Sequence, residues 1–381
     1  MLTLAFHARY IACANYSDPA PSACSWYAPN GSAFGSPPFF GALDATSGRV
    51  AAVDAITSKC LNYQDIYYTN IITPSASLAQ QHLMYVAPNA TSRSLTWTDV
   101  ASGKVAFIPV VQGNNGSESQ FPEPPAWMEL ADVKNRTCLL GWRRFARLSP
   151  GAPTMTLSES LDCVELDGAR LPALRLSSHL LWSNSSTVPA SAPRPPASFG
   201  YERAIDPDAR ILFVKSFNTT IARFDLAAAK FLTPLPTSRA TPALRCLHFD
   251  RTARRLGAIT LNTDQTTMTL FSIDNVTGVT TSRLTSPTLP AGVSPVFLFG
   301  KSADAPVCSF SAGSGRLAVL FADVDPHAKY AYLANTDVYA MVLDTRVPKW
   351  IGAAKIKAPL GRPPSGARWR AVSPSISFVD S

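Results

Sequence analysis

The ten residues GALDATSGRV (41–50) have the pattern of a strand, a tight turn and the start of a second strand. An Asp at a turn entrance can accept hydrogen bonds from backbone N–H groups two residues further on, and a Gly such as Gly48 can adopt a positive φ. The apolar residues on both sides can continue as strands. This stretch therefore predicts a β-hairpin.

The same pattern recurs along the whole chain. The repeats are LDATSGRV (43–50), TDVASGKV (98–105), LDGARLPA (166–173), FDLAAAKF (224–231), IDNVTGVT (273–280) and LDTRVPKW (343–350). Their aspartates, from Asp44 to Asp344, are separated by 49 to 70 residues. Four-stranded repeats with short loops need about 40 to 50 residues, so we interpret these units as such repeats with longer loops.

A second hairpin pattern precedes several of these aspartates. It occurs at AIDPDARILFV (204–214), HFDRTARRLGAI (248–259) and FSAGSGRLAVLF (310–321), and in a weaker form at ADVKNRTCLLGW (131–142). Each unit is therefore predicted to contain two hairpins. Asp206 and Asp208 fit the turn of such a hairpin better than a metal site.

The two ends of the chain complement each other. The first unit holds only the hairpin at Asp44, whereas the segment ARWRAVSPSISFVDS (367–381) has the pattern of a first hairpin without a second. Strands from opposite termini would then complete one unit and leave no open sheet edge.

These units resemble β-propeller blades, and GALDATSGRVAAV (41–53) is similar to the quinoprotein-type repeat, in which Asp, a Thr-Gly or Ser-Gly turn and a Trp recur. Trp350 matches that Trp, but no Trp follows Gly48, Gly103 or Gly278. The resemblance implies an all-β fold, a single propeller of six or seven four-stranded blades closed by pairing of the N- and C-terminal strands. It implies no quinone cofactor.

The expected domain organisation is an N-terminal segment, residues 1–33, followed by a propeller domain, residues 34–381. Residues 1–14 end in small residues like a signal peptide, but His7 and Arg9 interrupt the apolar run. A poor signal, a clipped signal and an ordinary first strand all remain open. The Pro- and Ser-rich runs at 120–125, 187–198 and 359–366 are interpreted as loops between units.

Composition and charge narrow the function classes. Only 16% of residues are charged, and the formal net charge of +8 comes from dispersed Lys and Arg residues. Such dispersion argues against nucleic-acid binding. No window approaches the ~18 consecutive apolar residues of a membrane-spanning helix, so we expect no membrane span.

Glycosylation sequons indicate a secretory route. The acceptor pattern occurs at 8 of the 13 asparagines, although the Ser and Thr content predicts about 2.4 by chance. We expect N-glycans at Asn89, Asn115, Asn135, Asn184, Asn218 and Asn275, largely in turns; Asn15 and Asn30 also match. The alternative is that Asn, Ser and Thr coincide because all three form turns.

The seven cysteines contain no C-x-x-C pair and fit one to three disulfides in a secreted β-protein, with at least one thiol left over. Metal binding has one candidate, DVDPH (323–327), because Asp323, Asp325 and His327 would share a face of an extended segment. The alternative for these three residues is an ordinary solvated loop.

No local catalytic motif is present, so no catalytic residue and no cofactor other than that divalent metal is assigned. We therefore favour a secreted, monomeric, glycosylated propeller that binds a protein or glycan as a scaffold module, rather than an enzyme. The alternative is a propeller hydrolase or lactonase with a metal at the mouth of the channel.

Overall fold

The computed structural model describes 26 β-strands and the turns that join some of them. The described residues are 3–13, 24–25, 39–44, 50–53, 71–72, 82–88, 93–99, 105–109, 127–133, 136–148, 153–167, 175–189, 191, 202–215, 220–237, 244–261, 267–288, 308–311, 314–322, 333–334, 338–347, 349–356 and 368–379. Side chains are described for part of these residues, from Ala131 onward. Among the described residues there is no helix, so none that could cross a membrane.

The strands form six antiparallel sheets, and five of them follow the chain order. The β5–β8 sheet contains β5 (Ile71–Ile72), β6 (His82–Pro88), β7 (Arg93–Asp99) and β8 (Val105–Pro109). The β9–β12 sheet contains β9 (Trp127–Val133), β10 (Arg136–Leu148), β11 (Thr154–Asp167) and β12 (Arg175–Pro189). The β13–β16 sheet contains β13 (Arg203–Asp206), β14 (Ile211–Lys215), β15 (Thr220–Asp225) and β16 (Lys230–Pro236).

Two more sheets continue this order, and the sixth joins the ends of the chain. The β17–β20 sheet contains β17 (Arg245–Asp250), β18 (Arg255–Leu261), β19 (Met268–Ile273) and β20 (Thr280–Thr285). The β21–β25 sheet contains β21 (Cys308–Ser311), β22 (Arg316–Ala322), β24 (Val338–Asp344) and β25 (Lys349–Ile356). The terminal sheet contains β23 (Leu333–Ala334), β26 (Arg368–Val379), β1 (Thr3–Cys13), β3 (Phe39–Asp44), β4 (Val50–Val53) and the short β2 (Cys24–Ser25).

The predicted aspartates stand at the end of the third strand of each sheet, and the described turns confirm their role. Asp225 Oδ1 accepts the N–H groups of Ala227 and Ala228, both at 2.9 Å. Asp274 and Asp344 accept N–H groups two and three residues further on in the same way. The repeated Asp is therefore a turn cap, as the sequence predicts.

The residue four positions after the capping residue has a positive φ in five described turns. Gly278 and Gly315 occupy this position in two of them, with φ of 76° and 66°. Arg210, Ala229 and Arg254 adopt φ between 52° and 54° in the others, without Gly. Where Gly is absent, the capped turn holds an L-residue in the left-handed region, which usually costs free energy.

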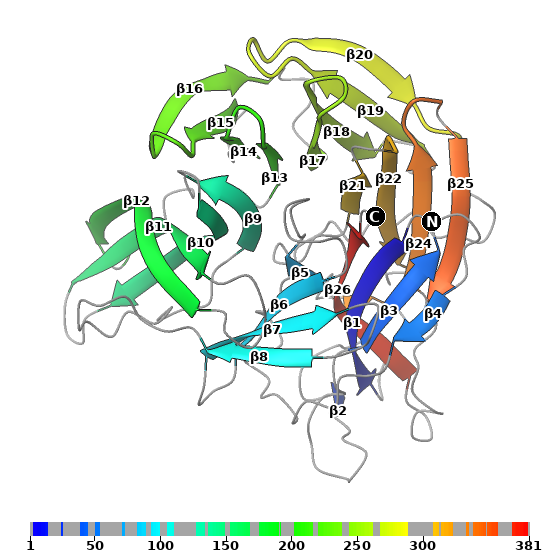
Figure 1. Cartoon of the computed structure of the whole chain (residues 1–381), viewed down its shortest axis with the longest axis horizontal. Helices are drawn as coiled ribbons and strands as arrows, with labels where there is room; N and C mark the ends of the chain where they lie inside the picture. Colours follow the sequence, from blue (N-terminus) through cyan, green and yellow to red (C-terminus); the bar gives the residue numbers. More distant parts are fainter. Residues whose placement is uncertain are drawn as a thin grey trace.

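The sheets succeed one another around a common centre, with β9, β13, β17, β21 and β26 on the inner side (Figure 1). In the part of the chain where side chains are described, apolar side chains fill the space between successive sheets from β9–β12 to β21–β25. One buried cluster joins Cys138, Leu140 and Trp142 of β10 to Leu212 of β14 and Phe224 of β15. Two further clusters join the β13–β16 sheet to the β17–β20 sheet, and that sheet to the β21–β25 sheet. Each core thus lies between neighbouring sheets.

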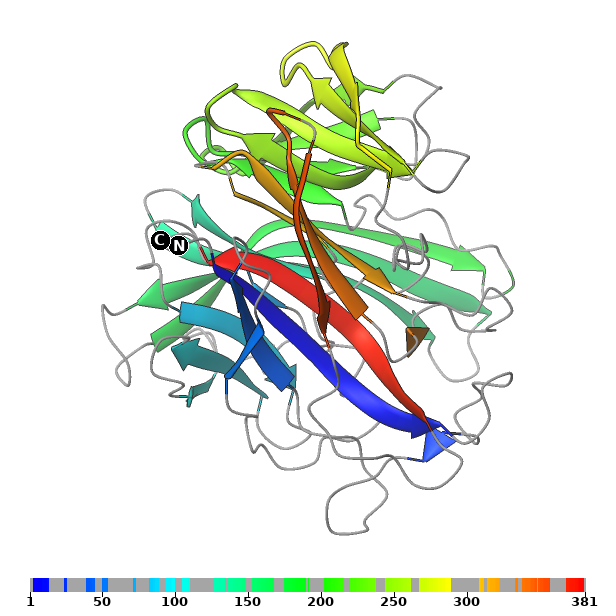
Figure 2. The ribbon, with the colours of Figure 1, turned by 90° about the vertical axis from the view of Figure 1, so that its right-hand side faces the viewer.

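The first and last strands of the chain pair with each other. β1 is antiparallel to β26, from Thr3 opposite Val379 to Cys13 opposite Arg368, and the two strands run side by side with the termini adjacent (Figure 2). The prediction of a hairpin within 367–381 is wrong, because this segment forms one 12-residue strand, β26. The strand that pairs with β26 is therefore β1, from the other end of the chain.

A bulge explains how one strand replaces the expected hairpin. The pairing shifts between His7, opposite Ser375, and Arg9, opposite Val372. Pro374 lies within this shift, and proline has no N–H to donate to a neighbouring strand. The Ser373-Pro374 pair is therefore accommodated as an irregularity within a continuous strand.

The topology separates two kinds of connection. The capped turns join first to second and third to fourth strands, so they share one edge of the sheets, which we call the turn face. Each fourth strand ends at the opposite edge, the connection face, where the chain leaves for the next sheet. The Pro- and Ser-rich runs at 120–125, 187–198 and 359–366 fall at or in these connections between sheets.

Candidate functional site

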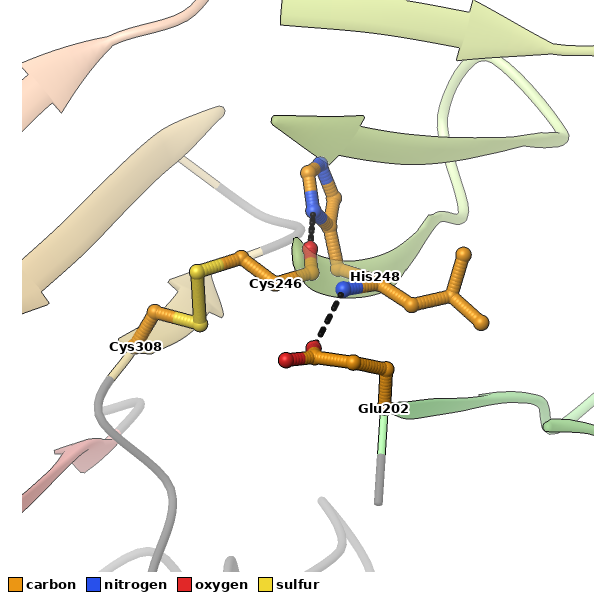
Figure 3. Close-up of a disulfide and its surroundings, with 5 residues drawn as sticks. Glu202, Cys246, His248 and Cys308 are labelled. Carbon is orange, nitrogen blue, oxygen red and sulfur yellow. Dashed lines mark hydrogen bonds between the residues drawn. A yellow bond between two sulfur atoms is a disulfide. The ribbon is translucent and has the colours of Figure 1, made fainter. Parts of the chain in front are cut away.

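The described polar side chains with the most perturbed environment lie where three inner strands meet. β17 contacts both β13 of the preceding sheet and β21 of the following sheet. Glu202, which precedes β13, reaches toward β17, and Cys308 on β21 bonds to Cys246 on β17 (Figure 3). We call this set, with Lys215, Arg245 and His248, the inner-strand cluster.

A bulge in β17 creates the geometry of this cluster. Arg245 pairs with Ile259 and His248 pairs with Gly257, so two residues of β17, Cys246 and Leu247, face a single residue of β18. Cys246 has a φ of 53°, in the left-handed region. Bulges re-aim backbone and side-chain groups, and here the Leu247 N–H donates to Glu202 Oε2 at 3.3 Å.

Glu202 is a half-buried residue whose carboxyl bridges two sheets. Burial raises its pKa, because the charged form loses solvation. Arg245 and the backbone N–H groups of Cys246 and Leu247 favour the carboxylate, but they offset the burial only in part. The Glu202 carbonyl also accepts the N–H of Lys215 at 2.8 Å. Glu202 therefore ties β14 and β17 together through its main chain and its side chain.

Lys215 supplies a second charged group near this junction. Its Nζ donates to the Leu244 carbonyl at 3.3 Å. Burial lowers the pKa of Lys215, and the positive charge of Arg245 lowers it further, while Glu202 acts in the opposite direction. Lys215 and Glu202 thus perturb each other, as neighbouring titratable groups do.

The disulfide Cys246–Cys308 links the inner strands of two successive sheets, with the Cα atoms 5.8 Å apart and a sequence separation of 62. A second disulfide, Cys138–Cys163, joins neighbouring strands β10 and β11 within one sheet, with a Cα–Cα distance of 5.2 Å. Two disulfides in the described part of the chain fit the one to three that the sequence predicts.

His248 lies beside the disulfide, and its ring lies close to Phe310 of β21 and to Gly257 of β18. Its Nδ1 is 2.8 Å from the Cys246 carbonyl, so this nitrogen carries the hydrogen and donates. Its ring stacks on Phe310 with centroids 4.1 Å apart. A Cβ added to Gly257 would lie 2.1 Å from Nε2, so glycine makes room for the imidazole. Burial lowers the pKa of His248 to about 4, which leaves the ring neutral near pH 7.

Chemically, the inner-strand cluster anchors backbone groups at the junction of the β13–β16 and β17–β20 sheets, and its disulfide adds a link to β21. Its carboxylate and ammonium bond to main-chain N–H and C=O groups, and its imidazole bonds to a main-chain carbonyl. Within the described residues, no group of three or more His, Cys, Asp and Glu side chains is placed to hold a metal ion.

Two further aspartates confirm the structural role that the sequence predicts for them. Asp206 caps the β13–β14 turn by accepting the N–H groups of Asp208 and Ala209, both at 3.0 Å. Asp208 forms a two-point ion pair with Arg251 of the next sheet, at 2.5 and 3.0 Å. The hydrogen bond from Arg251 lowers the pKa of Asp208. This pair connects the turn faces of neighbouring sheets.

Most of the predicted site residues lie outside the described residues. These are the metal candidates Asp323, Asp325 and His327, and the sequon residues Asn89, Asn115, Asn135 and Asn218, with Asn15 and Asn30. Asn275 lies in the β19–β20 turn as expected and is half-buried, and its carbonyl accepts a hydrogen bond from Arg223 Nη1 at 3.5 Å. Asn184 was expected in a turn, which is wrong: it is an exposed residue within β12.

Sequence reasoning missed the inner-strand cluster. Glu202 is isolated in sequence, and Leu247, whose N–H its carboxyl accepts, lies 45 residues away. The only local signal was the short stretch Cys246-Leu247-His248, which breaks the alternation of β17 and marks the bulge.

Comparison with known proteins adds little to this description. No family model and no curated protein matches the sequence. The crystal structure of TolB from Acinetobacter baumannii is similar at 10% identity and a TM-score of 0.43, covering 97% of this chain and 66%, just under two thirds, of that chain. The crystal structure of a nidogen/laminin complex is similar at 10% identity and a TM-score of 0.41, covering 98% of both chains.

The fold assignment rests on the molecule itself. Five four-stranded antiparallel sheets and the terminal sheet follow one another around a centre, and described apolar cores lie between successive sheets from β9 to β25 (Figure 1). Sheets packed in this radial way are blades. The chain has a β-propeller fold.

Proposed function

We propose that this protein is an extracytoplasmic, N-glycosylated β-propeller that acts as a binding or scaffold module for a protein or glycan partner. Its six sheets are the blades of one ring, and the ring is closed in the terminal sheet by β1 and β26. The partner binds at the connection face.

Ring closure is supported by contacts on both sides of β26. This strand pairs with β1 and also contacts β21 and β22 of the preceding sheet. The N–H of Phe378 donates to Ser309 Oγ at 2.9 Å, and the Ile376 and Phe378 side chains are buried. The last strand thus belongs to the terminal sheet and packs on the sheet before it.

The compartment is supported by the two disulfides. Disulfides persist in oxidising environments such as the secretory pathway and are rare in the cytosol. Cys246–Cys308, with Cys246 buried and Cys308 half-buried, lies at an inner-strand junction, where it ties two blades together. The sequon excess points to the same compartment.

The single observation that carries the binding role is the asymmetry of the two faces. The described turns of the turn face are short, and in them Asp225, Asp274 and Asp344 accept hydrogen bonds from backbone N–H groups of their own turns. The inter-blade connections all leave from the opposite face. Loops positioned by a rigid scaffold are where binding residues concentrate. The dispersed positive charge also favours partners that carry acidic groups.

The test compares the two faces of the secreted, full-length protein. Partners are first captured from a panel of purified extracellular proteins and an array of anionic glycans. Binding should fall at least tenfold when residues 190–198 are exchanged for a Gly-Ser segment of equal length. It should be unchanged in the matched turn-face variant Thr252→Ala. Equal binding by both variants, or loss only in the turn-face variant, would contradict the proposal.

Metal analysis of the same dialysed protein tests the alternative function. If the protein holds stoichiometric calcium or zinc and the Asp323→Asn variant loses it, the result would contradict the binding module and support a propeller hydrolase with a metal at the channel mouth. For the compartment, the intact mass should fall on endoglycosidase treatment. An unchanged mass, with all seven cysteines alkylated without reductant, would place the protein outside the secretory pathway.

A further inference from the structure

The outer edge of the β9–β12 sheet differs from the other outer edges. β12 is 15 residues long, and within the described residues it pairs only with β11, from Thr154 opposite Pro189 to Asp167 opposite Arg175. Its second edge carries a row of backbone N–H and C=O groups that can template another strand.

The other five outer strands carry recognised protection against such pairing. β16 contains Lys230 and two prolines, β20 contains Arg283, and β25 contains two lysines. β4 and β8 are short, with four and five residues. Lysine, proline and shortness are the devices that natural sheets use to blunt their edges. β12 has Arg175 and Pro189 only as its first and last residues, and between them it contains no Lys, Arg, Asp, Glu or Pro.

A bulge protects only the first half of β12. The register shifts between Leu161, opposite Trp182, and Asp162, opposite Leu180, which leaves Leu181 as an extra residue. From Trp182 to Pro189 the pairing with β11 is continuous. The Trp182 ring packs against Phe231 of the next blade, with centroids 5.3 Å apart, and so anchors the start of this straight segment.

The straight segment is exposed on both of its faces. Residues 183–187 are all exposed, although successive side chains of a strand point to opposite faces. Asn184 lies among them and begins the sequon Asn184-Ser185-Ser186. Its side chain therefore has space for a large hydrophilic substituent.

We propose that Asn184 carries an N-linked glycan that guards this edge against pairing with a second copy of the chain. The inference rests on the secretory route proposed above. In the transfer, Asn184 Nδ2 forms a bond to the anomeric carbon of an oligosaccharide. The bond from that carbon to a lipid diphosphate carrier breaks, the carrier leaves, and the amide nitrogen loses one proton.

The glycan protects a part of the β12 edge that has no charged side chain. Without it, two copies of the 182–189 segment can pair antiparallel about a twofold axis, which extends the sheet across both molecules. A hydrated oligosaccharide on Asn184 lies at the centre of that contact in each copy. It thus does for β12 what lysines do for β25.

The experiment uses the full chain secreted from a glycosylating host. The Asn184 peptide should carry a glycan mass. Asn184→Gln and Ser186→Ala each destroy the sequon, one at the acceptor residue and the other at the hydroxyl residue. Each variant should form at least dimers, so that its molar mass measured by light scattering at ~50 μM is at least twice that of the monomer. The matched control Asn275→Gln removes a turn sequon and should remain monomeric. The double variant Asn184→Gln with Ser186→Lys should also be monomeric, because the added charge blunts the edge.

The outcomes separate this inference from the proposed function. An unmodified Asn184 beside occupied sequons elsewhere would overturn the edge-guard role and leave the secretory assignment standing. Monomeric Asn184→Gln protein with native circular dichroism would do the same. If no sequon is modified and all cysteines are free, both proposals fail together.

Discussion

His248 should make the free energy of unfolding of this propeller depend on pH between about pH 4 and pH 6.5. In the folded protein its pKa is about 4, whereas the ordinary value is 6.5. The cause is burial against Phe310 and Gly257, which outweighs the hydrogen bond to the Cys246 carbonyl and the charge of Asp250. Between these two pKa values, the unfolded chain binds a proton that the folded chain does not.

The sign and the size follow from that difference. A group whose pKa is depressed by folding contributes stability above its unfolded pKa and loses it as the pH falls. Each pKa unit is worth about 1.4 kcal/mol, so the shift from 6.5 to about 4 corresponds to about 3 kcal/mol of unfolding free energy lost between pH 7 and pH 4.

The variant His248→Asn isolates this contribution. The Asn amide can donate to the Cys246 carbonyl as Nδ1 does, but it does not titrate. Urea unfolding of both proteins at pH 7, 6, 5 and 4 should show a stability difference that shrinks by about 3 kcal/mol across the series. All other titrating groups are common to both proteins. Parallel pH profiles for the two proteins would refute the burial of a neutral imidazole.

Three other predictions concern stability. Replacing both Cys246 and Cys308 by Ala should cost about 4 kcal/mol in denaturant unfolding, from the 62-residue separation that the disulfide closes, and a loss below about 1 kcal/mol would contradict this. Ala229→Gly should raise stability by up to about 1 kcal/mol, because its φ of 53° suits glycine, whereas Ala228→Gly in the same turn should lower it; equal effects in thermal unfolding would argue against a strained turn. Deleting β26 (Arg368–Val379) should abolish cooperative unfolding or cause aggregation, and a truncated protein that keeps its full melting temperature would exclude closure by this strand.

The repeated turns could be predicted from the sequence because their physics is local. Asp225 or Asp274 needs only the next three residues to form its cap, so the same short pattern appears wherever the turn does. The β class and the positions of most hairpins follow from these turns. The left-handed Ala229 shows the limit, since nothing in its own type announces a positive φ.

The inner-strand cluster could not be predicted in the same way. Glu202 bonds a backbone N–H that is placed by a bulge in a different blade, and Cys246 pairs with a cysteine chosen by the approach of β21. These contacts depend on how blades stack, and stacking is decided by side chains spread over several sheets. The strand position of Asn184 was missed for a related reason, because its polar sequence resembles a turn but extends an edge strand.

The pairing of β1 with β26 imposes an order on the making of the protein. β26 is synthesised after every other strand of its sheet, so at about 5 to 20 residues per second the residues between Cys13 and Arg368 keep β1 waiting for about 20 to 70 s. During that time β3 can already pair with β1, but the other side of β1 has no native partner. Blades in the middle of the chain need only sequence neighbours and can fold as they emerge. The terminal sheet can therefore be completed only after β26 has been made, and until then the unpaired edge of β1 is open to pairing with a wrong strand.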